Sequence, residues 1–489
     1  MRPVHSRWLT YLLIILSAAT LFALHFNGFS SNDFWIQAAV GNYIWQNFAL
    51  PETALYPFTV ARDYPFLVHE WFASVIISLI AKWSGDSGIG YALAKLGIAS
   101  ALFSFVFLLL RLRGGNLRLA LMLSSVISVF LSFRLTLRAE NLAFIYFAAF
   151  LYLFHKFIVS QNIWKIASLF LLTLLWVNTH GSFVVALVYV AIYLFSMLLD
   201  KFRFGTRNSI KPIVFLFLAL LIACFINPYG NEIFQSAAHI SSSAYMKTFI
   251  AEWQPPFSSA FSKTPSFYFY VCYLVISLLL ILKNFRKISN FDRLVYLSFA
   301  VLSLLALRHV VYFYLATIPI IIAIIANYTP VAAKKVTVAI AVLLIFNFAF
   351  VVIAGNYIQV KIGTNFEAPL NLATIQWLRT QNYTGPVFNS YMLGDQLVYN
   401  FFPNMRIVID SRTDLYGEDY IKRYQQTIYQ DDEFLQFLAG NQIKMIVVTN
   451  EDFSNYFQRS PKRLELMQSA GWKIGFRSED NFVLTLGVL

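Results

Sequence analysis

The stretch LTYLLIILSAATLFALHFN, residues 9–27, runs directly into the polar loop GFSSNDFW, residues 28–35, and this junction decides the fold. The apolar run is long enough to cross a bilayer as a helix, which takes about 20 residues. Runs of similar length recur along the first three quarters of the chain. The composition, 58% hydrophobic and only 12% charged, is too apolar for a soluble protein of this length. The sequence therefore predicts a polytopic α-helical protein of the plasma (inner) membrane.

Basic residues indicate how the spans are oriented. The net charge of +13 does not indicate a nucleic-acid partner, because the basic residues lie in short loops rather than along one stripe. Cytoplasmic loops are rich in Lys and Arg. Four basic connections share one side if the N-terminus is cytoplasmic and eleven runs cross; they are 111–118, 200–211, 283–293 and 328–335. The expected spans are 9–27, 88–110, 117–133, 139–158, 164–178, 182–199, 212–227, 266–283, 292–307, 310–327 and 335–354.

Residues 71–83 are apolar but too short for an ordinary span. We interpret them as an interfacial or re-entrant helix, since a crossing would make twelve spans and move the Arg111–Arg118 loop to the outside, against the charge rule. The resulting organisation is a transmembrane domain, residues 1–355, which includes an external loop, residues 28–87. A soluble domain, residues 356–489, follows on the external or periplasmic side.

The tail after about residue 360 has a different composition from the rest. Short β-rich runs at 386–388, 406–410 and 444–448 alternate with helical patterns at about 370–380, 417–428, 432–440 and 461–470. Residues 472–477 and 482–486 resemble the two strands of a hairpin. This alternation predicts a small α/β domain with its own core.

Acidic residues mark both ends of the first external loop. Asp33 lies in the first turn of an expected helix with an apolar stripe from Ile36 to Phe48, and His69-Glu70 precede the short apolar segment. Asp33 suits a general base at the membrane surface, or it merely complements the helix dipole. His69 and Glu70 either return toward Asp33 to bind an acceptor or cation, or form a solvated pair.

Further polar residues interrupt the apolar runs on the same expected side. Arg138, beside Arg134, suits phosphate recognition, unless it only forms an ion pair with Glu140. The turn at Asn178-Thr179-His180-Gly181 holds a histidine that a turn alone does not require. Charges at span ends that face a cavity are usually functional. The remaining candidates on the expected external side are Glu252, Arg308 and His309, and in the tail Asp410, Arg412, Asp414 and Tyr416, where a capped strand-to-helix turn is the alternative.

Taken together, these motifs resemble bacterial C-type (GT-C) integral membrane glycosyltransferases, the group that includes protein mannosyltransferase-like and lipid A sugar transferase-like proteins. The resemblance covers most of the chain, including the tail. It depends on the order and spacing of the motifs, each of which is weak alone. They are Asp33-Phe34-Trp35, His69-Glu70-Trp71, Arg138-Ala139-Glu140, Trp176–Gly181, Asn227-Pro228-Tyr229-Gly230, Glu252-Trp253 and Asp410–Tyr416.

The resemblance implies a sugar donor carried on a polyprenyl phosphate and an acidic residue of the first external loop that acts on the acceptor. Asp33 matches that position. Asn32 precedes Asp33, so the chain lacks a paired carboxylate at this position. The missing carboxylate puts a requirement for Mg or Mn in doubt. If a metal binds, its candidate ligands are Asp33 and Glu70. The expected partners are the lipid-linked donor, a glycan, lipid or protein acceptor, and membrane lipids.

The mechanism expected from this inventory is a single displacement with inversion at the sugar carbon. Asp33 is the base, His69 and Glu70 assist it, and Arg138 and Arg308 stabilise the departing phosphate. The main rival is a transporter or flippase, although the polar residues cluster at one membrane face rather than near the midplane. A polymerising ligase or an anchored receptor is a further alternative.

Overall fold

The structure is a computed structural model. It describes residues 5–27, 31–85, 88–204, 209–235, 250–328 and 368–487, together with Ala238 and Lys247. The chain divides into two compact units. Unit 1 contains Met1–Asn27 and Ala92–Thr364, and unit 2 contains Gly28–Tyr91 and Asn365–Leu489. The first loop therefore belongs to the same compact unit as the C-terminal residues. From the sequence, this loop was expected to be part of the membrane domain.

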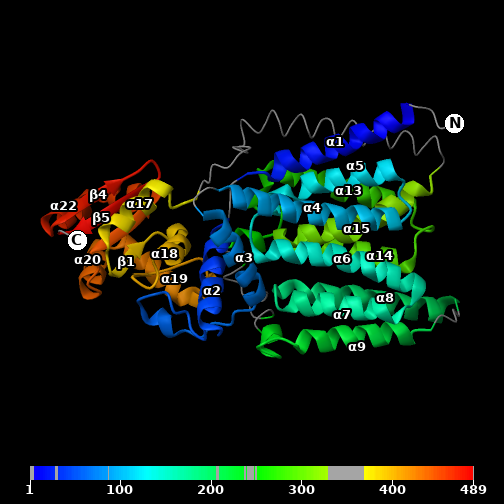
Figure 1. Cartoon of the computed structure of the whole chain (residues 1–489), viewed down its shortest axis with the longest axis horizontal. Helices are drawn as coiled ribbons and strands as arrows, with labels where there is room; N and C mark the ends of the chain where they lie inside the picture. Colours follow the sequence, from blue (N-terminus) through cyan, green and yellow to red (C-terminus); the bar gives the residue numbers. More distant parts are fainter. Residues whose placement is uncertain are drawn as a thin grey trace. The chain divides into compact units, whose positions relative to one another are not determined.

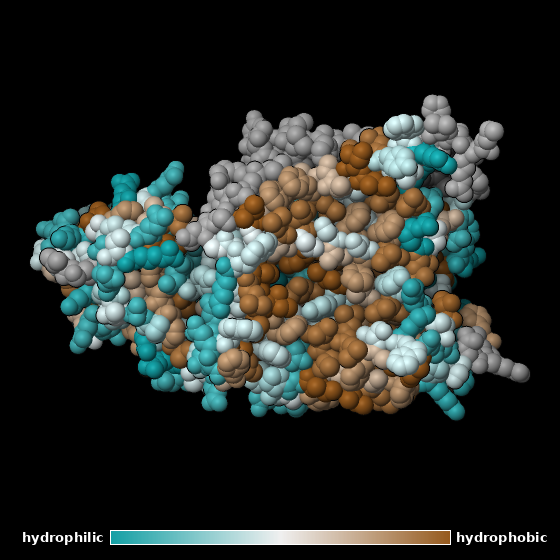
Figure 2. Space-filling model, viewed as in Figure 1, coloured by the Kyte–Doolittle hydropathy of each residue, from teal (hydrophilic) through white to brown (hydrophobic). Residues whose placement is uncertain are grey.

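Unit 1 is a bundle of helices that run alongside one another (Figure 1). Seven described stretches are long and apolar enough to cross a membrane. Two further apolar helices, α7 (Ile163–Val177) and α9 (Lys211–Phe225), are shorter. The expected span 335–354 lies outside the described residues. Hydrophobic residues cover the visible face of the bundle (Figure 2), as expected for a surface that contacts lipid. The helices are α1 (His5–His25), α4 (Ile89–Leu112), α5 (Leu117–Leu131), α6 (Ala139–Ser160), α7 (Ile163–Val177), α8 (Val184–Phe204), α9 (Lys211–Phe225), α12 (Ser259–Ser262), α13 (Pro265–Lys283), α14 (Asn290–Leu305) and α15 (Val310–Ala326).

Aromatic side chains and paired hydroxyls hold the bundle together. Phe147 and Phe154 are fully buried and pack edge-on against Tyr189. Tyr273 and Thr317 share a hydrogen bond of 2.8 Å between α13 and α15. Buried hydroxyl pairs of this kind satisfy polar groups where no water is available, and they fix the register of neighbouring helices.

The basic connections gather at one end of the bundle. Arg113, after α4, forms an ion pair of 3.0 Å with Asp292 at the start of α14. Asn290 donates a hydrogen bond of 2.5 Å to Asp200 near the end of α8. Three of the four basic connections predicted to be cytoplasmic therefore meet, and most of the fourth lies outside the described residues.

Unit 2 contains a five-stranded mixed sheet of order β2-β1-β3-β5-β4. β1 is parallel to β2 and β3, while β5 is antiparallel to β3 and β4. This is the α/β domain that the sequence predicts, with the hairpin at its C-terminal end. The strands are β1 (Gly385–Asn389), β2 (Met405–Ile407), β3 (Met445–Thr449), β4 (Trp472–Arg477) and β5 (Asn481–Leu486), and the helices are α17 (Leu372–Gln381), α18 (Gly394–Phe401), α19 (Thr413–Tyr429), α20 (Asp431–Gly440), α21 (Asn450–Phe453) and α22 (Pro461–Ser469).

The first loop adds two helices to unit 2, α2 (Asn32–Asn47) and α3 (Trp71–Ser84). They pack closely at Gly41, where an added Cβ would lie 2.0 Å from the Ser74 carbonyl oxygen. α2 also contacts α18. The apolar stripe predicted on α2 is buried at Ile36 and Val40, but Phe48 is exposed because it ends the helix in a left-handed conformation.

Residues 52–66 lie against the edge of the sheet. Phe58 donates its backbone N–H to the Ile407 carbonyl, and Pro57 pairs with Ile407 as an isolated parallel bridge. Thr59 and Tyr420 share a hydrogen bond of 2.8 Å. The edge strand β2 is thus covered by the loop, which protects its unpaired backbone groups.

Candidate active site: an arginine cluster and a carboxylate loop

An ion-pair cluster occupies the end of the unit 1 bundle opposite the basic connections. Arg138 donates to Glu140 at 2.6 Å and to Glu252 at 2.9 Å. Arg134, at the end of α5, also pairs with both glutamates and lies 2.7 Å from Glu252. Arg308 lies 3.7 Å from Glu140. The cluster therefore joins residues from three separate connections, and all but Arg134 belong to the predicted candidates.

The charges of this cluster do not cancel. Among the described residues, three guanidinium groups face two carboxylates in this cluster, which leaves one excess positive charge. Burial opposes ionisation of Glu252, but Arg134 and Arg138 outweigh it and lower the pKa of Glu252 to about 2. The carboxylate is therefore ionised at neutral pH. Such a cluster can accept one further anionic group with little change in its own geometry.

Arg308 is the arginine of the cluster most available to a ligand. Its side chain is 21% exposed, against 6% for Arg134 and 11% for Arg138. Its guanidinium stacks over the ring of Trp253 at 4.3 Å from the centroid. A cation held against an aromatic face keeps its N–H groups directed outward, toward a bound anion.

The histidines near the cluster have different surroundings. His180 Nδ1 accepts the Ser182 backbone N–H at 3.1 Å, and the ring lies near enough to Glu140 to interact electrostatically. His309 Nδ1 contacts the Leu302 carbonyl at 3.2 Å. Asn178 donates to the carbonyls of Leu174 and Ile226, which ties the end of α7 to the end of α9. Both histidines interact electrostatically with Glu140, and His309 also interacts with Arg308.

Asp33 belongs to unit 2, where other carboxyl groups surround it. It lies in the first turn of α2 and interacts electrostatically with Tyr391 and Asp395. Asp395, on α18, is fully buried, and its Oδ2 has no hydrogen-bond partner among the described residues. Burial raises the pKa of Asp395 well above its usual range, and Asp410 and Asp33 raise it further.

The close approach of α18 to β2 explains how Asp395 comes to be buried. An added Cβ at Gly394 would lie 2.1 Å from the Ile409 carbonyl oxygen. The Ser411 backbone N–H donates to Asp395 Oδ1 at 2.9 Å. Asp395 was not among the residues predicted from the sequence. The sequence feature that could have indicated it is an acidic residue directly after a glycine, within a short amphipathic run.

His69 and Glu70 lie in the same unit as Asp33. His69 Nε2 is 3.6 Å from Glu70, and Asp414 also interacts with it electrostatically. Burial alone would lower the pKa of His69, but the hydrogen bond and charge of Glu70, together with the charge of Asp414 and the Leu67 backbone, outweigh burial and raise the pKa. Gln37, one turn after Asp33 on α2, donates to Glu70. Glu70 is therefore linked by Gln37 to the helix that carries Asp33.

The tail candidates hold one another in place. Asp410 accepts hydrogen bonds from Arg412 at 2.6 Å and from Tyr416 at 2.8 Å. Arg412 also donates to the Ala54 carbonyl at 3.0 Å and stacks over the rings of Tyr56 and Phe66. The Asp410–Arg412 pair therefore holds the first loop against the sheet through the hydrogen bond to Ala54. Asp414, the remaining candidate in the tail, is exposed.

Replacing Arg412 with glutamine is expected to destabilise unit 2 by about 3–5 kcal/mol, because the buried Asp410 carboxylate would lose its charged partner. Thermal unfolding and limited proteolysis of the full chain would measure the loss. The control is Arg423→Gln, which changes an exposed arginine of α19. Equal stability of the two variants would contradict the fastening role.

Metal ligands are not assembled in the part of the chain that the structure describes. No group of three or more His, Cys, Asp or Glu side chains is placed there to hold a metal ion. The predicted metal candidates, Asp33 and Glu70, therefore do not form a site with a third ligand among the described residues.

Comparisons with known proteins identify the fold. No protein-family model and no curated protein matches the sequence. Among solved structures, the chain is similar to the archaeal oligosaccharyltransferase AglB from Archaeoglobus fulgidus in complex with an inhibitory peptide and a dolichol-phosphate. The TM-score is 0.58 at 12% identity, over 99% of this chain and 75% of that chain. The chain has the GT-C fold.

Two further solved structures agree with this fold. A complex of the Archaeoglobus fulgidus oligosaccharyltransferase with Zn and sulfate gives a TM-score of 0.56 at 13% identity, over 97% of this chain and 73% of that chain. ArnT from Cupriavidus metallidurans bound to undecaprenyl phosphate gives 0.55 at 12% identity, over 99% of this chain and 98% of that chain. The predicted polytopic GT-C architecture is confirmed, and the roles of individual residues stay predictions.

Proposed function

We propose that this protein is a membrane glycosyltransferase that moves a sugar from a polyprenyl-phosphate-linked donor to a hydroxyl acceptor. The observation that carries the proposal is the buried arginine cluster, with its one excess positive charge. The similar structures that contain dolichol-phosphate and undecaprenyl phosphate support a lipid phosphate as the anion.

The charge of the cluster fits the donor. A sugar linked to a lipid through one phosphodiester carries a single negative charge, which the excess guanidinium neutralises. When the sugar leaves, the phosphate gains a second ionisable oxygen. Arg308 and Arg138 are proposed to stabilise that developing charge, which is the kind of electrostatic contribution that lowers a transfer barrier most.

Asp33 is the proposed base. The acceptor hydroxyl gives its proton to the Asp33 carboxylate as its oxygen attacks the sugar carbon, and the bond from that carbon to the phosphate oxygen breaks. His69 and Glu70 orient the acceptor. Because one displacement occurs at the carbon, the product has the inverted configuration.

The arginine cluster is proposed to lie on the external side of the membrane. The basic connections meet at the other end of the bundle, and such connections are cytoplasmic as a rule. The donor then enters from the external leaflet, and the C-terminal domain is external.

The test is a reaction in closed vesicles that contain the purified chain, a panel of polyprenyl-phosphate sugars and hydroxyl acceptors. The proposal expects a new glycosidic bond whose anomeric configuration, read by NMR, is opposite to that of the donor. Retention would contradict the single displacement. Movement of the intact donor across the bilayer without any glycosidic product would instead indicate a flippase.

A further inference from the structure

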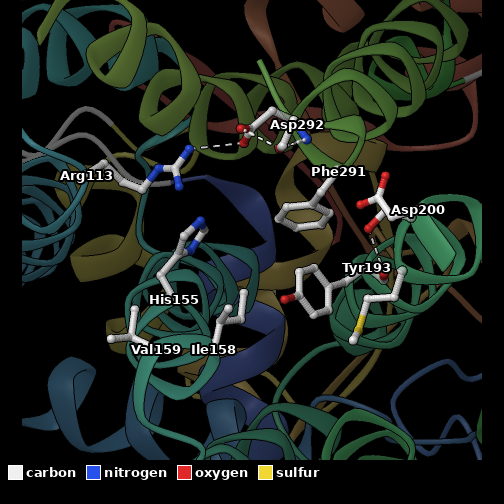
Figure 3. A pocket seen from close by; sticks show the side chains of 11 residues that line it. Arg113, His155, Ile158, Val159, Tyr193, Asp200, Phe291 and Asp292 are labelled. Carbon is white, nitrogen blue, oxygen red and sulfur yellow. Dashed lines mark hydrogen bonds and ion pairs between the residues drawn. The ribbon is translucent and has the colours of Figure 1, made fainter. Parts of the chain in front are cut away.

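A cavity of about 300 Å³ lies at the basic end of the bundle, away from the arginine cluster. Its lining comes from the ends of α6 and α8, the start of α14 and the connection after α4 (Figure 3). The volume is at the lower end of the range for small-ligand sites, roughly 300–1,000 Å³. The acidic and basic side chains among its described lining residues are Arg113, His155, Asp200 and Asp292.

The positive group of the cavity is already paired inside it. Arg113 forms an ion pair of 3.0 Å with Asp292, and the Ser289 hydroxyl donates to the other oxygen of Asp292 at 2.8 Å. A carbonyl only accepts, so His155 donates its Nδ1–H to the Leu151 carbonyl at 2.8 Å and keeps a lone pair on Nε2. Figure 3 shows this neutral ring turned toward the Arg113 guanidinium. This part of the cavity therefore offers no free positive charge to a ligand.

Asp200 supplies the charge that the cavity does not balance. The Asn290 side chain donates to Asp200 Oδ1 at 2.5 Å, while its own amide oxygen accepts from Arg293 at 2.9 Å. The amide is neutral, and among the described residues no Lys or Arg side chain forms an ion pair with Asp200. Because Arg113 and Asp292 cancel, the lining carries one net negative charge, and Asp200 Oδ2 is the oxygen available to a ligand.

Aromatic and apolar groups surround this carboxylate in the cavity. Tyr193 lies seven residues before Asp200 on α8, which places both side chains on the same face of the helix. The rings of Tyr193 and Phe291 pack edge to face with their centroids 4.8 Å apart. Aromatic faces attract cations and also cover the apolar part of a ligand. The aliphatic and thioether lining residues are Ile158, Val159 and Met197.

The lining favours an organic cation over an anion or a metal ion. An anion would meet a net negative site. A metal ion needs several ligands at short range, and among the described residues no three His, Cys, Asp or Glu side chains are placed to hold one. An ammonium needs only hydrogen-bond acceptors and an apolar or aromatic enclosure. One positive charge balances the lining, and a second would exceed it.

We propose that this cavity binds a monovalent organic ammonium, a primary amine carried on an apolar or aromatic body. The ammonium donates hydrogen bonds to Asp200 Oδ2, and the body lies against the rings of Tyr193 and Phe291. Primary ammonium groups occur on soluble amines and on lipid head groups. The soluble amine is the ligand assigned, because a lipid head group would also bring a phosphate to a net negative lining. The site is separate from the arginine cluster and does not depend on sugar transfer.

The test is isothermal titration of the full-length protein in phosphatidylcholine nanodiscs, with empty nanodiscs as the blank. Three probes of similar shape are compared: phenethylammonium, phenethyl alcohol and 3-phenylpropionate. Phenethylammonium is expected to bind at least about tenfold more tightly than the alcohol, since hydrogen bonds to charged groups discriminate to this extent. Equal binding of the ammonium and the alcohol, or tighter binding of 3-phenylpropionate, would overturn the proposal.

A charge-removing variant locates the binding to the cavity. Asp200→Asn keeps the side-chain shape and is expected to weaken phenethylammonium binding about tenfold, with little effect on phenethyl alcohol. The matched control is Asp419→Asn, which makes the same charge change at an exposed position of α19. Equal affinity of the two variants for phenethylammonium would refute the site.

A second variant keeps the test decisive if Asp200→Asn does not fold. Met197 lines the cavity three residues before Asp200, so the two side chains are neighbours on α8. Met197→Lys places an ammonium of the chain's own beside the carboxylate, in a side chain of similar length. It is expected to weaken phenethylammonium binding by at least about tenfold. Unchanged affinity in folded Met197→Lys would contradict the proposal.

A change of lipid separates a soluble amine from a lipid head group. The titration is repeated in nanodiscs that contain equal parts of phosphatidylcholine and phosphatidylethanolamine. The affinity for phenethylammonium is expected to stay the same, because the phosphate of phosphatidylethanolamine is disfavoured by the lining. Weaker binding in the mixed nanodiscs would mean that the lipid competes for the cavity, and it would overturn the assignment to a soluble amine.

Discussion

Replacing Asp33 with asparagine is expected to lower kcat for sugar transfer by about 10²–10⁴-fold, the usual contribution of a positioned general base. Asparagine has nearly the same size and keeps a polar group in the first turn of α2, but it cannot take a proton from the acceptor. The lost interaction with the helix dipole costs only about 0.3–1 kcal/mol, so the chain should still fold. KM for the lipid-linked donor should hardly change, because the phosphate contacts are assigned to other residues.

The matched control for Asp33 is Asp63→Asn. Asp63 is an exposed acid in the same loop, at the end of the short helix Val60–Asp63. Both variants would be compared by initial rates at saturating donor and by thermal unfolding. Asp33→Asn with nearly normal kcat would remove Asp33 as the base, and an equal loss in Asp63→Asn would show that loop charge, rather than one base, controls the rate.

Much of the fold could be predicted because the signals are local. Apolar runs give the membrane helices, and short β-rich runs give the strands at 385–389, 445–449 and 481–486. α18 was missed because its eight residues carry only a short amphipathic pattern. The association of the first loop with the C-terminal sheet was also missed, because it depends on contacts such as Arg412 with Ala54, 358 residues apart.

The candidate site shows the same division between local and long-range information. Arg138 and Glu140 are two residues apart, so the sequence alone indicates an ion pair between them as the alternative to phosphate recognition by Arg138. Glu252 joins the same cluster from a distant connection, which only the packing of the bundle reveals. The raised pKa of Asp395 follows from burial and from the charge of Asp410, and neither is visible in a linear pattern.

Arg308→Gln is expected to weaken binding of polyprenyl phosphate by about 10–100-fold, because a hydrogen bond to a charged group contributes about 1.5–3 kcal/mol. Arg308 is the most exposed arginine of the cluster and has the longest contact with its carboxylate, 3.7 Å. Its removal therefore disturbs the remaining ion pairs little. Titration of the purified protein with polyprenyl phosphate would measure Kd, and KM for the donor should rise in parallel.

The matched control is an arginine of the bundle outside the cluster, Arg293→Gln. Arg293, on α14, contacts the Phe285 carbonyl and Asn290 at the basic end. The Arg293→Gln substitution removes one positive charge, as Arg308→Gln does, and should leave the Kd for polyprenyl phosphate unchanged. Equal weakening by both variants would show a general effect of net charge on lipid binding rather than a site.

A second substitution tests the charge balance with the opposite sign. Glu252→Gln raises the excess charge of the cluster from one to two, so binding of polyprenyl phosphate should tighten if the two arginines keep their places. The carboxylate of Glu252 is ionised because Arg134 and Arg138 lower its pKa to about 2, so the substitution removes a full charge at neutral pH. Opposite shifts in Kd for Arg308→Gln and Glu252→Gln would follow from excess positive charge at one anion site. Weaker binding in both variants, with both folded, would mean that the ion pairs only hold the helices together.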